Sequence, residues 1–229
     1  MKEAREQQRT RIRTDLRLSL PTSYFTLISL IQGTAIGFLG NVVAEHHRTF
    51  SHVQWLSAVT TFLIIVQVWN EYRMSVTVWA GVPVLQDSVV PFTLGASEFW
   101  LIFAIPVTSL WLLALTFVAL GGIVAYIHVQ RLALLPENEE MAIHRPYMRG
   151  QLALSLAYGI VFGGLWLLYR RDQGLSSAWG PVVALIMVTG LLLRAEWHWR
   201  RVLDIVSSWD DQESATVRHH NASVSRPDA

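Results

Sequence analysis

The sequence predicts an all-α protein, a multi-pass transmembrane helical bundle with six spans preferred and five possible. Of its 229 residues, 52% are hydrophobic and 15% are charged, whereas a soluble domain carries about 25% charged residues. The apolar residues stand in long blocks rather than in alternation, which indicates helices surrounded by lipid. Residues 82–127 contain only two charges, Asp87 and Glu98. This run is too long for one crossing and long enough for two.

Composition and motifs exclude several classes of function. The net charge of +1 argues against nucleic acid as a partner, because nucleic-acid binders carry a strong basic excess. The absence of cysteine excludes disulfides, thiolate metal sites and cysteine nucleophiles. The histidines at 46, 47 and 52 match no zinc-binding spacing, and neither a nucleotide-binding glycine loop nor a GxSxG element occurs. We therefore expect no enzyme, no metal and no cofactor.

The chain begins with a charged segment that leads into the first two spans. Residues 1–20 hold six of the 18 Lys and Arg residues. This predicts a basic amphipathic segment on the cytoplasmic membrane surface rather than a cleaved signal peptide. Pro21 then begins the first span, roughly 22–43. The second span begins near His52 and ends before Gly81.

The apolar run decides between the two topologies. As one span, 98–128, it gives five crossings; as two spans, 84–104 and 108–128, it gives six, with a tight turn between them. With six spans, 15 of the 18 Lys and Arg residues lie on the side of the N-terminus, and with five only 9. Because cytoplasmic loops carry the excess of Lys and Arg, we predict six spans with both termini cytoplasmic.

The rest of the sequence predicts two further spans and a C-terminal segment, which gives the chain four regions in all. Two further spans are expected near 150–169 and 178–195, after a polar loop. The Arg-rich N-terminal segment, without a targeting signal, favours a bacterial inner membrane. The predicted regions are a basic cytoplasmic segment at 1–20, a transmembrane helical domain at 21–195, an amphipathic cytoplasmic helix at 196–209 and a disordered tail at 210–229.

Small and polar residues share one face of the first span. Gly33 and Gly37 on this face have the GxxxG spacing that lets two helices approach closely. The face is interpreted either as helix packing or as the lining of a pore, and both hold if the first spans pack around the axis of an oligomer. Gly159 and Gly163 form a second small-residue face, interpreted as helix packing. The first-span residues predicted to line a pore are Leu27, Leu30, Ile31, Gln32 and Thr34.

The second span has a polar face, to which Thr60, Gln67 and Glu71 belong. Polar groups at membrane depth usually face protein or water, so these three residues complete the predicted pore lining. Glu71 has two interpretations: it pairs with Arg73 at the membrane interface, or it is a cation or proton site.

Asp87 and Glu98 are the acids of the long apolar run. If residues 84–104 cross the membrane, both are intramembrane or interfacial acids; otherwise both flank a loop. Pro91 lies between them and is expected to break the helix, because proline removes a backbone hydrogen bond.

A resemblance to a known family adds an expectation about function. The stretch TTFLIIVQVWNEYRM and the following VVPF resemble the bacterial single-repeat relatives of the endolysosomal potassium channel, with Trp69 and Pro91-Phe92 in the matching places. The family's Phe-Ser-Asp signature is absent, since the first span begins with Tyr24-Phe25-Thr26. The resemblance implies a tetramer whose first spans line a pore, with an apolar constriction at Leu27, Leu30 or Ile31.

These features predict an integral membrane protein that forms a homo-oligomeric ion channel, lined by its first two spans. Lipid and small cations, potassium among them, are the expected partners. The alternative is a non-transporting sensor, scaffold or effector module, whose basic N-terminal segment recruits a partner or anionic lipid.

Overall fold

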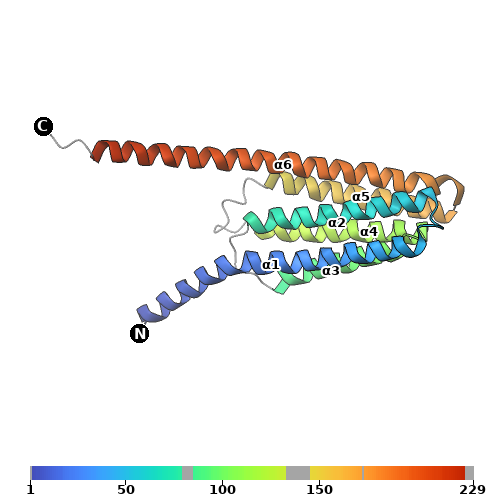
Figure 1. Cartoon of the computed structure of the whole chain (residues 1–229), viewed down its shortest axis with the longest axis horizontal. Helices are drawn as coiled ribbons and strands as arrows, with labels where there is room; N and C mark the ends of the chain where they lie inside the picture. Colours follow the sequence, from blue (N-terminus) through green and yellow to red (C-terminus); the bar gives the residue numbers. More distant parts are fainter. Residues whose placement is uncertain (1, 79–84, 133–144, 172, 225–229) are drawn as a thin grey trace. The chain divides into compact units, whose positions relative to one another are not determined.

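The described residues form six helices and no strand, as Figure 1 shows. The computed structural model describes residues 2–78, 85–132, 145–171 and 173–224, with side chains at 22–74, 89–131, 145–171 and 179–204. The all-α prediction is therefore confirmed. In chain order the helices are α1 (Lys2–His46), α2 (His52–Val78), α3 (Leu85–Ala104), α4 (Thr108–Leu132), α5 (Arg145–Arg171) and α6 (Gln173–Val224).

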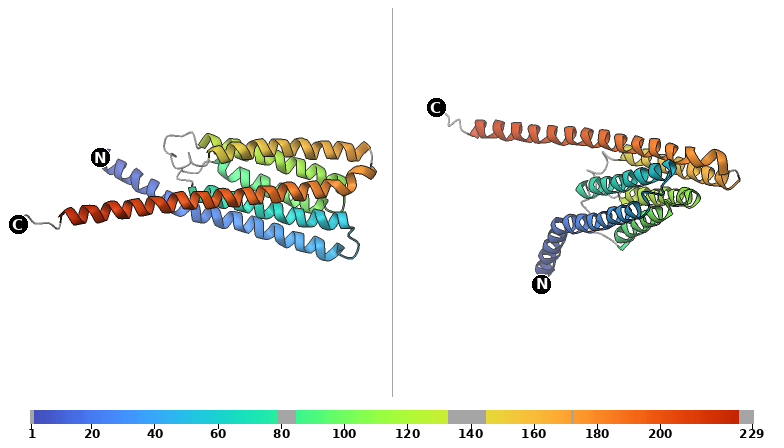
Figure 2. Two further views of the ribbon diagram at one scale, coloured as in Figure 1. Left: turned by 90° about the horizontal axis from the view of Figure 1, so that it is seen from above. Right: turned by 45° about the vertical axis from the view of Figure 1, so that its right-hand side comes forward.

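The chain divides into two units, Met1–Leu192 and Leu193–Ala229, and α6 contributes to both. In the first unit, successive helices run in opposite directions (Figures 1 and 2). There α4 lies against α3 and α5, while α1 lies against α2 and α3. The described part of the second unit is a single helix, along which Arg200 Nε lies 2.8 Å from Glu196 Oε1.

The long apolar run is divided into two helices, as the six-span topology predicted. α3 ends at Ala104 and α4 begins at Thr108. Backbone hydrogen bonds close the turn between them, since the Ile105 amide donates to the carbonyl of Ile102 at 3.2 Å and the Val107 amide to that of Ala104 at 2.9 Å. The predicted helix boundaries at 104 and 108 are thus confirmed.

Five helices contain stretches that are long and apolar enough to cross a membrane. The shortest of these stretches has 23 residues, and at about 1.5 Å per residue it exceeds a hydrocarbon core of roughly 30 Å. Large apolar side chains such as Leu30 and Ile160 are 66% and 68% exposed, which suits a surface covered by lipid rather than water. The stretches are Thr22–His46, His52–Met74, Thr108–Arg131, Arg145–Arg171 and Trp179–Asp204; the described apolar part of α3, Val89–Ala104, is shorter.

Two prolines expected to mark helix boundaries lie inside helices. α1 runs through Pro21, so the basic segment at 1–20 and the first span are one continuous helix. α3 runs through Pro91, which was expected to break it. Pro91 is buried in the bundle, and burial of its ring there offsets the single backbone hydrogen bond that proline removes.

Residues 210–224, which belong to the predicted disordered tail at 210–229, continue α6 as a helix. Residues 191–224 contain neither glycine nor proline, so no residue in this stretch has a large intrinsic cost in a helix. The last five residues of the predicted tail lie outside the described residues.

The core of the first unit is anchored between α4 and α2. Trp111 is fully buried, and its ring N–H donates to the hydroxyl of Thr61 at 3.0 Å. Thr61 in turn donates to the carbonyl of Ser57 at 2.7 Å. The ring N–H of Trp111 and the hydroxyl of Thr61 therefore both have hydrogen-bond partners inside the core. Around this contact pack the buried side chains of Ile65, Leu101, Ile102, Leu112, Leu115 and Ala184.

α5 approaches α4 closely at the small-residue face predicted to pack. A Cβ atom added to Gly159 would lie 3.8 Å from the Cβ of Ala119, and one added to Gly163 would lie 3.7 Å from Cγ2 of Thr116. Both glycines therefore face α4 at ordinary contact distance. This is the arrangement in which small residues bring two membrane helices together.

The glycines of α1 behave differently from those of α5. A Cβ atom added to Gly33 or Gly37 would meet nothing within 4 Å, so their face contacts no other described helix of the chain. The close approach of α1 to α3 depends on Gly95 instead, where an added Cβ would come within 2.7 Å of Cγ2 of Ile31. The packing face of α1 within the chain is therefore not its GxxxG face.

Candidate functional site

A buried carboxylate and a buried amide meet between α1 and α3. Glu98 has no exposed surface and Gln32 is 4% exposed. Nε2 of Gln32 donates to Oε1 of Glu98 at 3.1 Å. Gln32 lies near the middle of Thr22–His46, which is long and apolar enough to cross a membrane, so a membrane crossed by this stretch would enclose the pair. Glu98 thus belongs to the bundle interior and does not flank a loop; the side chain of Asp87 lies outside the described residues.

The Gln32–Glu98 pair has more acceptors than donors. Oε2 of Glu98 and Oε1 of Gln32 are both buried and have no hydrogen-bond partner among the described residues. A carboxylate only accepts hydrogen bonds, so the amide turns its NH₂ group toward Glu98 and its oxygen away. No basic side chain of the described residues forms an ion pair with Glu98. A proton, a small cation or a water molecule would supply what the pair lacks.

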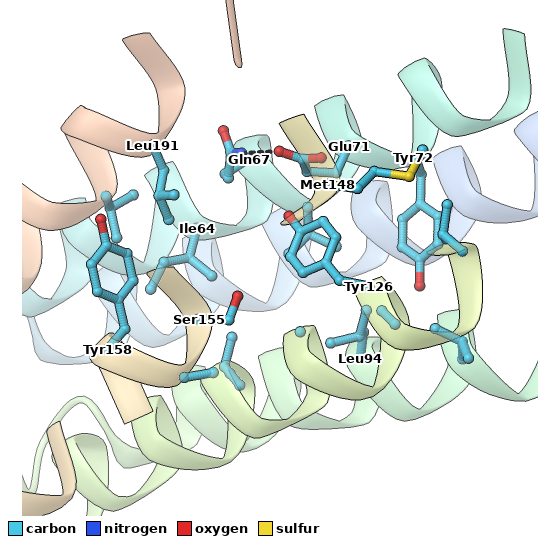
Figure 3. Close-up of a pocket in the computed structure, with 18 of the residues that line it drawn as sticks. Ile64, Gln67, Glu71, Tyr72, Leu94, Tyr126, Met148, Ser155, Tyr158 and Leu191 are labelled. Atoms are coloured by element: carbon cyan, nitrogen blue, oxygen red, sulfur yellow. Dashed lines mark hydrogen bonds between the residues drawn. The ribbon is translucent and has the colours of Figure 1, made fainter. Parts of the chain in front are cut away.

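A second acid, Glu71 on α2, is held by side chains of its own helix and of α5. Its Oε1 accepts from Nε2 of Gln67 at 2.6 Å, from the hydroxyl of Tyr147 at 2.5 Å and from Nε2 of Gln151 at 2.9 Å. Gln151 also donates to the Tyr147 hydroxyl at 2.5 Å. The hydroxyl of Tyr126 on α4 points toward the same carboxylate (Figure 3). Oε1 of Glu71 therefore joins α2 to α5.

The Glu71 cluster also has unpartnered acceptors. Oε1 of Gln67 and Oε1 of Gln151 are buried and without a hydrogen-bond partner among the described residues. Both amides turn their NH₂ groups to Glu71, for the same reason as at Gln32. Glu98 and Glu71 are thus each hydrogen-bonded to neutral amides whose own oxygens lack donors in the part of the chain that is described.

A cavity of about 180 Å³ lies beside Glu71. Gln67, Glu71 and Tyr126 lie together on it, and Ser155 and Tyr158 come from α5 (Figure 3). The Tyr158 hydroxyl donates to the carbonyl of Met187 at 3.2 Å. Most of the remaining wall is apolar, with Ile64, Val68, Leu94, Leu115, Val118, Phe162, Val188 and Leu191 among its residues.

The pore-lining candidates of the first span are distributed around α1. Leu30 is 66% exposed, and Thr34 is also exposed and donates its hydroxyl to the Leu30 carbonyl at 2.8 Å. Leu27 and Ile31 are half-buried, and Gln32 is buried against α3. They therefore do not line one surface.

The candidates of the second span face the interior of their own chain. Thr60 is fully buried, with its hydroxyl unpartnered among the described residues, while Gln67 and Glu71 line the cavity. A pore shared between copies would need these side chains on the outside. The polar face of α2 thus packs inside the bundle of its own chain, and a path lined by all eight candidates stays a prediction.

Two residues of the Glu71 cluster were missed in the sequence. Tyr147 and Gln151 lie one helical turn apart at the start of α5; Tyr147 falls at the end of the predicted polar loop and Gln151 at the start of the span predicted near 150–169. Their spacing of four residues was a usable signal, because it places two polar groups on one helical face. The spacing does not predict that their partner is Glu71 on α2.

No group of three or more His, Asp or Glu side chains that would hold a metal ion occurs among the described residues. Comparison of the chain with protein-family models, with curated proteins and with solved structures found no match.

Proposed function

We propose that the protein carries small monovalent cations across a membrane by way of acidic side chains inside its helical bundle. The observation that carries this proposal is the Gln32–Glu98 pair, in which a fully buried carboxylate keeps one oxygen without a hydrogen-bond partner among the described residues. Ionisable side chains at membrane depth are costly, and they mark ion and proton pathways in membrane proteins. A cation at Glu98 would remove the cost of burying the charge.

Glu71 provides a second acidic position for such a path. Its cluster also presents amide oxygens without donors, at Gln67 and Gln151. Amide, carboxylate and hydroxyl oxygens are suitable ligands for a dehydrated monovalent cation, because they replace its water molecules. The proposed path lies within one chain. It therefore differs from the pore expected from the sequence, which would lie on the shared axis of several copies.

We further propose that the chains associate through the outer face of α1. This face is supported by the open space at Gly33 and Gly37 and by the resemblance to tetrameric potassium channels, which also makes potassium the first ion to test. The charge distribution favours a bacterial inner membrane with both termini cytoplasmic. Cross-linking of single cysteines placed at Gly33 and, as a control, at Leu167 on the outer surface of α5 would test this association.

Ion flux in liposomes tests the proposal. The purified protein is reconstituted and flux is compared under gradients of potassium, sodium and protons. The variant is Glu98→Gln, which keeps the shape of the side chain and removes its charge. The matched control is Glu45→Gln, because Glu45 is exposed and accepts a hydrogen bond from Asn41 within α1. We expect Glu98→Gln to reduce flux at least about tenfold and Glu45→Gln to leave it unchanged.

Two results would contradict the proposal. Selective flux that is equal in wild type and Glu98→Gln would exclude Glu98 from the path. The absence of flux under all three gradients, from protein that is folded and inserted, would exclude cation transport.

A non-transporting sensor or effector module is the second candidate function. The cavity beside Glu71 favours it, because a bundle can bind a ligand there without opening a path across the membrane. Absent flux together with saturable ligand binding would select this function.

A further inference from the structure

We propose that the cavity beside Glu71 binds a small primary amine with an apolar body, with its ammonium group at the Glu71 end. This inference does not rest on cation transport and uses neither Glu98 nor Gln32. It follows from the volume of the cavity, from the apolar side chains of its wall, and from the buried Oε1 atom of Gln67 beside Glu71, which has no hydrogen-bond donor among the described residues.

The size limits the ligand. The cavity measures about 180 Å³, and an apolar protein cavity of about 150 Å³ holds one benzene molecule. The space beside Glu71 therefore accepts one six-membered ring, or a chain of similar volume, with one or two further atoms. A lipid with two acyl chains is too large for it.

The wall selects an apolar body. Ile64, Leu94, Leu115 and Phe162 contribute hydrocarbon surface from four different helices. Moving a ring from water onto such a surface is favourable by roughly 25 cal/mol per Å² of apolar area removed from water. A bare inorganic ion would leave this part of the cavity empty.

The polar end of the cavity favours a ligand with a cationic head. Glu71 is the acidic side chain at this end, and the buried Oε1 atom of Gln67, which also lines the cavity, has no donor among the described residues. An ammonium group has three donors and no acceptor, so it matches this end in both charge and hydrogen bonding. A carboxylate ligand would be repelled by Glu71, and a hydrocarbon without a polar head would leave the oxygen of Gln67 unpartnered.

Calorimetric titration of the reconstituted protein with benzylamine tests the inference. The protein is held in lipid nanodiscs at neutral pH, and empty nanodiscs are titrated in parallel to subtract partition into lipid. Benzyl alcohol has nearly the same shape without the charge and serves as the matched ligand. We expect saturable binding of one benzylamine per chain, at least about tenfold tighter than benzyl alcohol.

Three variants locate the site. Glu71→Gln should remove the preference for benzylamine over benzyl alcohol while leaving the weaker binding of the alcohol. Ala125→Leu, which places a larger side chain in the cavity wall, should weaken both ligands at least about tenfold. Val124→Leu is the control, because Val124 is the neighbouring residue on the outer surface, 61% exposed; it should bind like wild type.

The inference is overturned if benzylamine shows no saturable binding above empty nanodiscs, or if Ala125→Leu binds it as tightly as Val124→Leu does. Equal affinity for the amine and the alcohol in the wild type would also overturn it, since Glu71 would then select no charge. Glu98→Gln separates the two proposals, because it should abolish cation flux and leave benzylamine affinity unchanged.

Discussion

Gln32 and Glu98, 66 positions apart in sequence, form a buried hydrogen bond of 3.1 Å between α1 and α3. The bond joins the first span to a helix whose existence was the open question of the topology. It also gives Glu98 its one described hydrogen bond in the bundle.

The first prediction concerns the coupling of Gln32 and Glu98. Gln32→Leu removes the donor and leaves the buried carboxylate without one, so the free energy of unfolding should fall by about 1–3 kcal/mol or more. The double variant Gln32→Leu with Glu98→Leu should recover most of this loss, because replacing both partners with apolar groups leaves no unpaired group. Unfolding by denaturant in detergent is measured for the wild type, for each single variant (Gln32→Leu and Glu98→Leu) and for the double variant. A double variant as unstable as the sum of its parts would show that the two residues are not coupled.

The second prediction distinguishes the two kinds of glycine. Gly95→Ala should destabilise the protein by about 1–3 kcal/mol, because its new Cβ would lie 2.7 Å from Cγ2 of Ile31 and overpack the contact of α1 with α3. Adding Ile31→Ala should relieve the overlap. Gly33→Ala is the control, since a Cβ there meets nothing within 4 Å, and alanine favours the helix by about 1 kcal/mol. Thermal unfolding of the four proteins gives the comparison; equal loss in Gly95→Ala and Gly33→Ala would contradict the described contact.

The third prediction concerns the link between α2 and α5. Tyr147→Phe removes a hydrogen bond to Glu71 and leaves one N–H of Gln151 without its acceptor. The expected cost is about 1–3 kcal/mol in the free energy of unfolding. Tyr169→Phe should cost less than about 0.5 kcal/mol, because no hydrogen bond to the Tyr169 hydroxyl is described. If both variants unfold at the same denaturant concentration, the Glu71 cluster does not hold the two helices together.

The helices themselves could be predicted from the sequence because they depend on local information. The break between 104 and 108 was predictable since the apolar run exceeds one crossing and the distribution of Arg and Lys requires a reversal. The continuation of α6 to Val224 was missed because polarity was taken as a sign of disorder, although that stretch contains no residue that breaks a helix.

The partners of the site could not be predicted in the same way. Periodicity places Thr60, Gln67 and Glu71 on one face of α2, but it does not say which neighbour that face meets. The face of Gly33 and Gly37 matched a packing motif, yet α1 meets α3 through Ile31 and Gly95. Helix rotation is set by all the side chains in the contact together, and a single span does not contain that information.

The described partner of Glu98 is an amide, which is neutral, so an ionised Glu98 would have no opposite charge beside it from this partner in the electric field of an energised membrane. Displacing one elementary charge through the full field is worth about 2.3 kcal/mol per 100 mV, and on the proposed cation path an ion that binds Glu98 would cross a fraction of that field. The occupancy of Glu98 would then depend on membrane voltage, in a direction set by the side from which the cation enters. An arginine in place of Gln32 would cancel the charge and, with it, this sensitivity.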